Sequence, residues 1–220
     1  MDIFSKDHGR LDLVAKGIKK NKKQKADTYD LYQKYLLSWV AKSELGTLTY
    51  IEHTAQFSQL KPESMMLGFY INEITMRLLH KHEPHAELFL AYESILSRIQ
   101  QAEDENVLLR YYECALLQAL GYGIVLDYDV NTGEVIKSDE QYIYQFDYGP
   151  TNAIKNKKEA NGVRISGETL LQLSTEKLSG EICINEAKHL LRSILNRHLG
   201  SKPLASRQLY QSYLRNKKVS

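Results

Sequence analysis

PESMMLGFYINEITMRLLHKH, residues 62–82, marks the point at which the chain changes its hydrophobic period. Its apolar residues recur every three or four positions, and Pro62 stands where a first helical turn accepts proline. Before it, residues 1–58 contain short runs of β-branched and aromatic residues, punctuated by Gly9 and Gly17, which predict strands. The chain is therefore expected to be an α+β protein in which the strands come first.

Further helical patterns follow this stretch as far as the C-terminal region. They cover residues 84–101, 106–123, 166–174, 185–200 and 204–214, and the third is expected to begin through Ser166 as its N-cap. Residues 124–164 lack a helical period and carry an aromatic run, which predicts an irregular, partly β insertion. The expected domains are thus a small barrel at 1–60 and a mainly helical domain at 61–220.

Composition is that of a globular protein rather than a disordered one. Of the 220 residues, 43% are hydrophobic and 25% charged, with four prolines and twelve glycines, so a packed core is expected. Cys114 and Cys183 have no partner at a metal-ligand spacing, which indicates buried thiols in a reducing cytosol. No apolar window has the length of a membrane span, and Met1 opens an acidic segment unlike a signal peptide. We expect a cytoplasmic protein.

Charge is segregated along the chain although the net charge is only +2. Residues 10–25 contain seven basic side chains and one acidic one, and residues 187–220 contain eight basic side chains and no acidic one. The remainder is therefore acidic. Two basic segments separated by an acidic one favour a polyanionic ligand on one surface.

The run LVAKGIKKNKKQK, residues 13–25 (the lysine run), holds six lysines and permits three interpretations. It could be a solvated loop, a nuclear import signal if the source has a nucleus, or a phosphate-binding loop that projects from the barrel. Aromatic residues on neighbouring strands support the third, because basic grooves with exposed rings hold single strands. The same rings could instead belong to the core; they are Tyr35, Trp39, Tyr50 and Phe57.

Motifs for catalysis or metal binding are weak or absent. His80, His82 and His85 lie close together, but their spacing straddles a predicted helix end and favours surface histidines over a zinc site. The NTGE turn at 131–134 lacks the alternating ligands of a calcium loop. No nucleophile elbow, phosphate-binding loop, dinucleotide fingerprint or zinc-protease motif is present. A binding protein is favoured over an enzyme, while a nuclease built from scattered carboxylates stays open.

Seven collinear segments resemble the bacterial RecO recombination-mediator family. They are HGRLDLVAKG, GTLTYIE, GFYINEITMRLL, PHAELFLAYE, LLRYYECALLQALGYG, ISGETLL and HLGSKPLASRQLY. The resemblance implies an N-terminal OB-fold barrel and a helical domain with a zinc-ribbon-like insertion. It also implies a non-enzymatic, nucleoid-associated DNA repair protein without a cofactor. Such a protein binds single- and double-stranded DNA, anneals strands, engages the tail of single-stranded-DNA-binding protein, and acts with RecR to load RecA.

The chain departs from the family pattern in two places. Relatives usually have a further strand before DIFSKDHG, so the first barrel strand is expected to be missing here. Many relatives carry CxxC pairs in the insertion, whereas this chain has Asp129 and Thr132 at the first pair. We therefore expect a metal-free insertion held by aromatic packing of Tyr142, Tyr144, Phe146 and Tyr148.

Charge, aromatic content and the resemblance together give a set of candidate binding residues. The candidate DNA-binding residues are Arg10, Lys16, Lys19, Lys20, Lys22, Lys23, Lys25, Tyr35, Trp39, Lys188, Arg192, Arg197, Lys202 and Arg207. The resemblance also places Arg110 where a family arginine holds the partner tail, although it could instead pair with Glu113 on the helix surface. The alternative function is a protein-interaction adaptor whose DNA contact is incidental.

Overall fold

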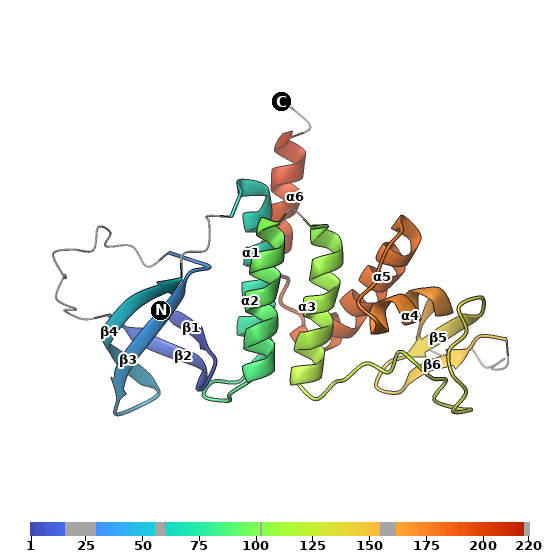
Figure 1. The fold of residues 1–220 in the computed structure, drawn as a ribbon, viewed down its shortest axis with the longest axis horizontal. Helices are drawn as coiled ribbons and strands as arrows, with labels where there is room; N and C mark the ends of the chain where they lie inside the picture. Colours follow the sequence, from blue (N-terminus) through green and yellow to red (C-terminus); the bar gives the residue numbers. More distant parts are fainter. Residues whose placement is uncertain (16–29, 56–59, 102, 155–161, 218–220) are drawn as a thin grey trace. The chain divides into compact units, whose positions relative to one another are not determined.

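The computed structural model describes residues 1–15, 30–55, 60–101, 103–154 and 162–217, and these fall into two compact units. The first unit comprises Met1–Ala102 and Gln208–Ser220, and the second comprises Glu103–Arg207. The expected order is confirmed, since an N-terminal sheet is followed by a mainly helical part (Figure 1). The boundary between the compact units lies after Ala102, whereas the change from strands to helices occurs at Pro62. The first two helices therefore belong to the first unit.

The sheet of the first unit contains four strands in the described residues, in the order β1-β2-β4-β3. Their bounds are β1 Asp2–Ser5, β2 Gly9–Val14, β3 Lys34–Ala41 and β4 Leu45–Ala55. β2 lies antiparallel to β1 and parallel to β4, and β3 lies antiparallel to β4. Along β2 the side chains alternate between buried and half-buried, so Leu11 and Leu13 form a core with Leu48.

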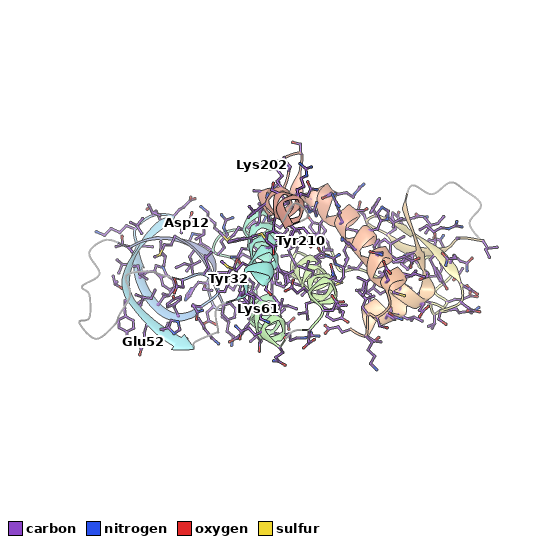
Figure 2. All side chains as sticks on the ribbon, turned by 90° about the horizontal axis from the view of Figure 1, so that it is seen from above. Asp12, Tyr32, Glu52, Lys61, Lys202 and Tyr210 are labelled. Carbon is purple, nitrogen blue, oxygen red and sulfur yellow. The ribbon has the colours of Figure 1, made fainter. Side chains whose placement is uncertain are left out.

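The closed barrel expected from the resemblance is not seen in the described residues. β1 and β3 are the two edges of the sheet, although the sheet is strongly curved (Figure 2). Two register shifts between β3 and β4 accompany this curvature, as β-bulges bend a strand. The four strands therefore form an open, curved sheet.

Two helices, α1 Pro62–Leu78 and α2 Ala86–Gln100, complete the described part of the first unit together with the end of α6. Phe4 of β1 contacts the rings of Phe89 and Tyr92 on α2, with centroids 5.6 and 6.0 Å away. Lys34 of β3 forms an ion pair with Glu93 at 2.6 Å. Both edge strands of the sheet are thus attached to α2.

The second unit is built on α3 Glu105–Ala119, α4 Gly167–Ser174 and α5 Glu181–Leu199. Asp104 caps α3 by accepting a hydrogen bond from the amide of Asn106 at 2.8 Å. The predicted N-cap of α4 is confirmed, because the Ser166 hydroxyl accepts from the amide of Thr169 at 3.2 Å. α5 buries the side chains of Cys183, Ala187, Leu190, Leu191, Ile194, Leu195 and Leu199.

The insertion of the second unit carries a small sheet in the order β6-β5-β7. The strands are β5 Gln141–Gln145, β6 Gly149–Asn152 and β7 Gly162–Ser166. Tyr142 and Tyr144 are buried as expected, but Tyr148 is 73% exposed, so the prediction that it packs in the insertion was wrong. Its place in the turn between β5 and β6 turns the ring toward solvent.

The last helix, α6 Ala205–Lys217, begins in the second unit and continues into the first. Among the described residues, no helix combines the length and the apolar content needed to cross a membrane.

Candidate nucleic-acid interface

Basic side chains form a stripe on the exposed face of α5, within the second unit. Lys188 and Arg192 are exposed and four residues apart, so they lie one above the other on the helix. Asn196 follows four residues later, and its side-chain oxygen accepts a hydrogen bond from Nη1 of Arg207 at 3.0 Å. Lys188, Arg192 and Arg207, with Asn196 between the last two, are called the α5 stripe below.

The cations of this stripe differ in whether they form hydrogen bonds or ion pairs with other residues of the protein. Within the part of the chain that the structure describes, Lys188 and Arg192 have no ion-pair or hydrogen-bond partner. Arg207 is held by Asn196, which fixes the direction of its guanidinium. Two unpaired cations beside an oriented guanidinium can bind successive phosphates of a nucleic-acid backbone.

An open pocket of about 460 Å³ lies at the N-terminal end of the stripe. Lys188 lines it together with the carboxylates of Asp104 and Glu181. Because these carboxylates would repel phosphate, the favourable part of the stripe runs from Lys188 toward Arg207.

Arg197, another predicted DNA contact, has a structural partner in the insertion. Its Nη2 lies 3.2 Å from Oδ2 of Asp147, and its guanidinium stacks over the ring of Phe146 at 4.9 Å. These contacts attach the β5–β6 turn to α5. Lys202, labelled in Figure 2, lies in the exposed loop between α5 and α6 and extends the positive surface beyond the helix.

Arg10 of β2 also contacts the protein rather than projecting into solvent. Its Nη1 donates to the carbonyl oxygen of Met76 on α1, and its Nη2 lies 3.3 Å from Oδ1 of Asp2. On the next segment, Lys81 pairs with Asp12. Arg10 therefore joins the sheet to the end of α1.

The two predicted aromatic contacts, Tyr35 and Trp39, are both half-buried on β3. Trp39 packs against the Leu11, Leu13 and Leu48 core and meets His8 edge-on, with ring centroids 4.8 Å apart. Tyr35 accepts a hydrogen bond from the amide of Asp30 at 3.1 Å, and its ring meets His53 edge-on. The core interpretation thus applies to Trp39, and base stacking at either ring stays a prediction.

The predicted contacts in the lysine run lie outside the described residues. They are Lys16, Lys19, Lys20, Lys22, Lys23 and Lys25. The first two residues of the lysine run, Leu13 and Val14, are the last two residues of β2.

A family model and individual relatives both match this chain, and both point to the same family. The family model described as "Recombination protein O C terminal" matches residues 59–208. A DNA repair protein RecO from Nitrosospira multiformis is 36% identical over 213 residues, which cover 97% of this chain and 88% of that protein. Another, from Nitrosococcus oceani, is 35% identical over 220 residues, 100% of this chain and 89% of that protein. The chain belongs to the RecO family.

Membership in the RecO family brings attention to Arg110 on α3, the residue expected to hold a partner tail. The residue is 4% exposed, and its Nε and Nη2 lie 2.8 and 2.9 Å from the two oxygens of Glu113. The alternative pairing with Glu113 is confirmed, although the pair is buried rather than on the helix surface. Cys114 directly follows Glu113, and desolvation by burial, with the negative charge of Glu113 as a smaller cause, raises the pKa of the Cys114 thiol.

Sequence reasoning missed Asn196, the residue of the α5 stripe that orients Arg207. Its position four residues after Arg192 could have drawn attention to it, but the contact with Arg207 depends on how α6 begins. As for metal ligands, the described residues contain no group of three or more His, Cys, Asp or Glu side chains that could hold an ion.

Proposed function

We propose that this RecO-family protein binds single- and double-stranded DNA and anneals complementary strands without catalysing a covalent reaction. The α5 stripe is the observation that carries the proposal, because α5 presents Lys188 and Arg192, neither of which has a partner among the described residues, and Arg207 of α6 is bonded to Asn196 of the same helix. A polyanion neutralised along such a stripe can be brought close to a second strand, since the repulsion between phosphates is lowered.

The same proposal includes the place of the protein in repair. It acts in the bacterial cytoplasm on chromosomal DNA, with RecR, to help load RecA onto DNA coated with single-stranded-DNA-binding protein. The names of the RecO relatives support the role in DNA repair. The buried Arg110–Glu113 pair does not favour the adaptor alternative, because Arg110 would have to leave Glu113 to bind a tail.

We also propose that the curved sheet of the first unit belongs to an OB-fold-like barrel. Its support is the eleven-residue β4, which pairs with both β2 and β3 while the sheet curls. Hydrogen exchange tests this: the β3 amides that do not pair with β4 are protected if another strand closes the barrel. Exchange at the rate of solvent-exposed amides would mean that the sheet stays open.

Salt-dependent binding tests the DNA proposal. If about six phosphates are contacted, the logarithm of affinity falls with the logarithm of salt concentration at a slope of about −4 to −5. K188A/R192A should lower the magnitude of the slope for single-stranded DNA by about 1.4. The matched control is R164A/K177A, which removes the same number of positive charges from exposed positions of the second unit outside α5.

Two outcomes of this experiment would contradict the proposal. A slope near zero for the wild-type protein would exclude a phosphate-driven mechanism, and an equal effect of both double variants would mean that the stripe has no special role. Annealing on DNA coated with single-stranded-DNA-binding protein, with and without the tail of that protein, tests the mediator role. Tight binding of the tail peptide without binding of oligonucleotides would favour the adaptor.

A further inference from the structure

The family resemblance predicts a zinc-ribbon-like insertion at residues 124–164, in the second unit. A structural zinc site needs four Cys or His ligands in most cases. Residues 124–164 contain neither cysteine nor histidine, and Asp129 and Thr132 stand at the first CxxC pair. The question is what stabilises this segment in place of a metal.

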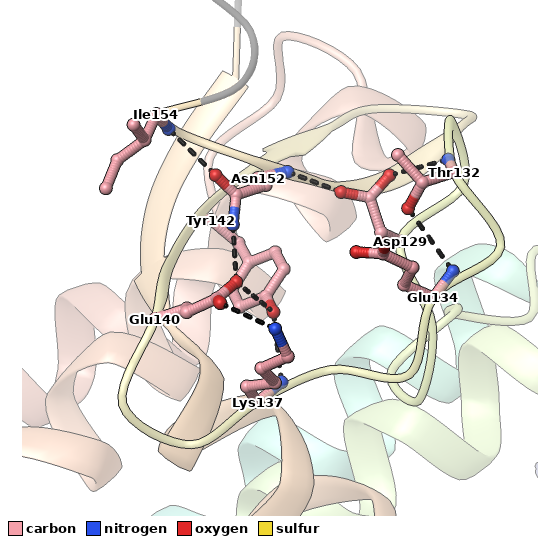
Figure 3. Close-up of polar contacts among 8 residues, drawn as sticks. All are labelled: Asp129, Thr132, Glu134, Lys137, Glu140, Tyr142, Asn152 and Ile154. Carbon is pink, nitrogen blue, oxygen red and sulfur yellow. Dashed lines mark hydrogen bonds and ion pairs between the residues drawn. The ribbon is translucent and has the colours of Figure 1, made fainter.

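Asp129 is the centre of a hydrogen-bond network in the insertion (Figure 3). The side chain is 3% exposed, and its Oδ1 accepts from the amides of Asn131 and Thr132 at 2.8 and 3.1 Å. Its Oδ2 accepts from the amide of Asn152 on β6 at 2.7 Å. One carboxylate thus closes its own turn and fastens that turn to the sheet.

Asn152 connects this carboxylate to a second one. Its side-chain nitrogen donates to Oε2 of Glu140 at 2.5 Å, and its side-chain oxygen accepts from the amide of Ile154 at 3.0 Å. Glu140 also accepts from the hydroxyl of Tyr142 and from Nζ of Lys137, at 3.3 and 3.0 Å. Figure 3 shows the two carboxylates on either side of Asn152.

These residues do not fit a metal ion. Three backbone N–H groups point at the Asp129 carboxylate, and their positive ends would repel a cation placed there. Both of its oxygens accept hydrogen bonds, so coordination of a metal would require breaking bonds to a charged acceptor, one of them from the buried amide of Asn152. The side chains of Lys137, Tyr142 and Asn152 likewise all donate hydrogen bonds to the Glu140 carboxylate.

We propose that the Asp129 carboxylate, linked through Asn152 to Glu140, replaces the structural metal of the zinc-ribbon-like insertion. The insertion therefore folds and stays folded without zinc. The Asp129 carboxylate joins the turn at 129–134 to β6 through hydrogen bonds, in the way that a zinc ion joins two pairs of ligands.

The test begins with the full-length wild-type protein. Elemental analysis after purification should find far less than one zinc per chain, and a chelator should leave the thermal unfolding temperature unchanged. Added zinc should not raise that temperature. One tightly bound zinc per chain, or a chelator-induced fall in unfolding temperature, would overturn the proposal without requiring any variant.

A pair of variants then tests the role of the carboxylate. D129A should lower the unfolding temperature by about 5–10 °C, because the buried amide of Asn152 and the two amides of the turn lose a charged acceptor. D139N is the control, since Asp139 is exposed in the same insertion and has no partner among the described residues. Equal unfolding temperatures for D129A and wild type would contradict the proposal. If D129A does not fold, D129N, which keeps one acceptor oxygen, should give an intermediate loss.

Discussion

Arg110 and Glu113 on α3 are both buried, and the ion pair between them stabilises each charge away from water. R110A should destabilise the protein by about 3–5 kcal/mol, because it removes the cation that faces the buried Glu113 carboxylate. R110M/E113L removes both charges at similar volume and should be close to neutral. Urea unfolding measures both. A loss below about 1 kcal/mol for R110A would show that Glu113 is solvated or paired elsewhere.

Glu186 on α5 makes a second residue-scale prediction, through its pKa. Burial alone would raise the pKa of Glu186, but hydrogen bonds from the Ser166 hydroxyl and amide and from the Thr169 hydroxyl, at 2.6, 3.0 and 2.5 Å, lower it. A carboxyl whose pKa is lower in the folded state stabilises the fold above its unfolded pKa. This contribution is lost as the pH falls through the ordinary glutamate value of 4.5 and below.

E186Q should therefore lower the unfolding temperature at neutral pH, and the difference from wild type should shrink in acid. Thermal unfolding followed across this pH range measures it. E44Q is the control, because Glu44 is exposed between β3 and β4 and has no partner among the described residues, so this variant removes a carboxylate without removing such hydrogen bonds. A difference between E186Q and wild type that is the same at all pH values would contradict the assignment.

At the scale of elements, the packing of β2 against the segment before α2 depends on Gly9. Its φ is +65°, and a Cβ there would lie 2.0 Å from the carbonyl oxygen of Glu83. The adjacent amide of His82 donates to the carbonyl of Arg10 at 3.0 Å, so the two segments cannot separate without losing that bond. G9A should cost about 3 kcal/mol or more.

G121A separates the two causes of this loss. Gly121 also has a positive φ, +78°, but a Cβ there meets nothing within 4 Å. The backbone strain alone should cost about 1–2 kcal/mol. Denaturant unfolding should therefore give a much lower free energy of unfolding for G9A than for G121A. Equal losses would mean that the backbone at Glu83 moves away from a Cβ at position 9 at little cost.

Local patterns predicted the elements of this molecule better than the contacts between them. The change of period at residue 62 and the Ser166 cap are local, and both are found in the structure. The pairing of β2 with β4 and the bond from Asn152 to Asp129 join segments that are distant in sequence, and the Asn196–Arg207 contact joins two different helices; periodicity encodes none of these contacts.

The candidate site shows the same limit. The exposure of Lys188 and Arg192 follows from their places on the polar face of an amphipathic helix. Arg10 and Arg197 are equally basic in sequence, yet their guanidinium groups are used for Met76, Asp2, Phe146 and Asp147. A count of charges cannot separate cations that bind the protein itself from cations available to a ligand.

At the scale of the whole molecule, positive charge lies in two segments, the lysine run and the region from residue 187 onward. We expect both to contact the same DNA molecule. If they do, the losses in salt slope should add, because each released counterion contributes separately. K19A/K20A/K22A/K23A should reduce the slope for single-stranded DNA by about 2.8, K188A/R192A by about 1.4, and the combined variant by about 4.2.

Titration of a fluorescent single strand at several salt concentrations measures these three slopes. Unchanged binding by the four-lysine variant would assign the DNA surface to the α5 stripe alone. A combined variant no weaker than the four-lysine variant would instead show that the stripe is used only when the run is intact. Additive losses would mean that both segments contribute to DNA binding, which would explain how a protein of net charge +2 can hold a polyanion.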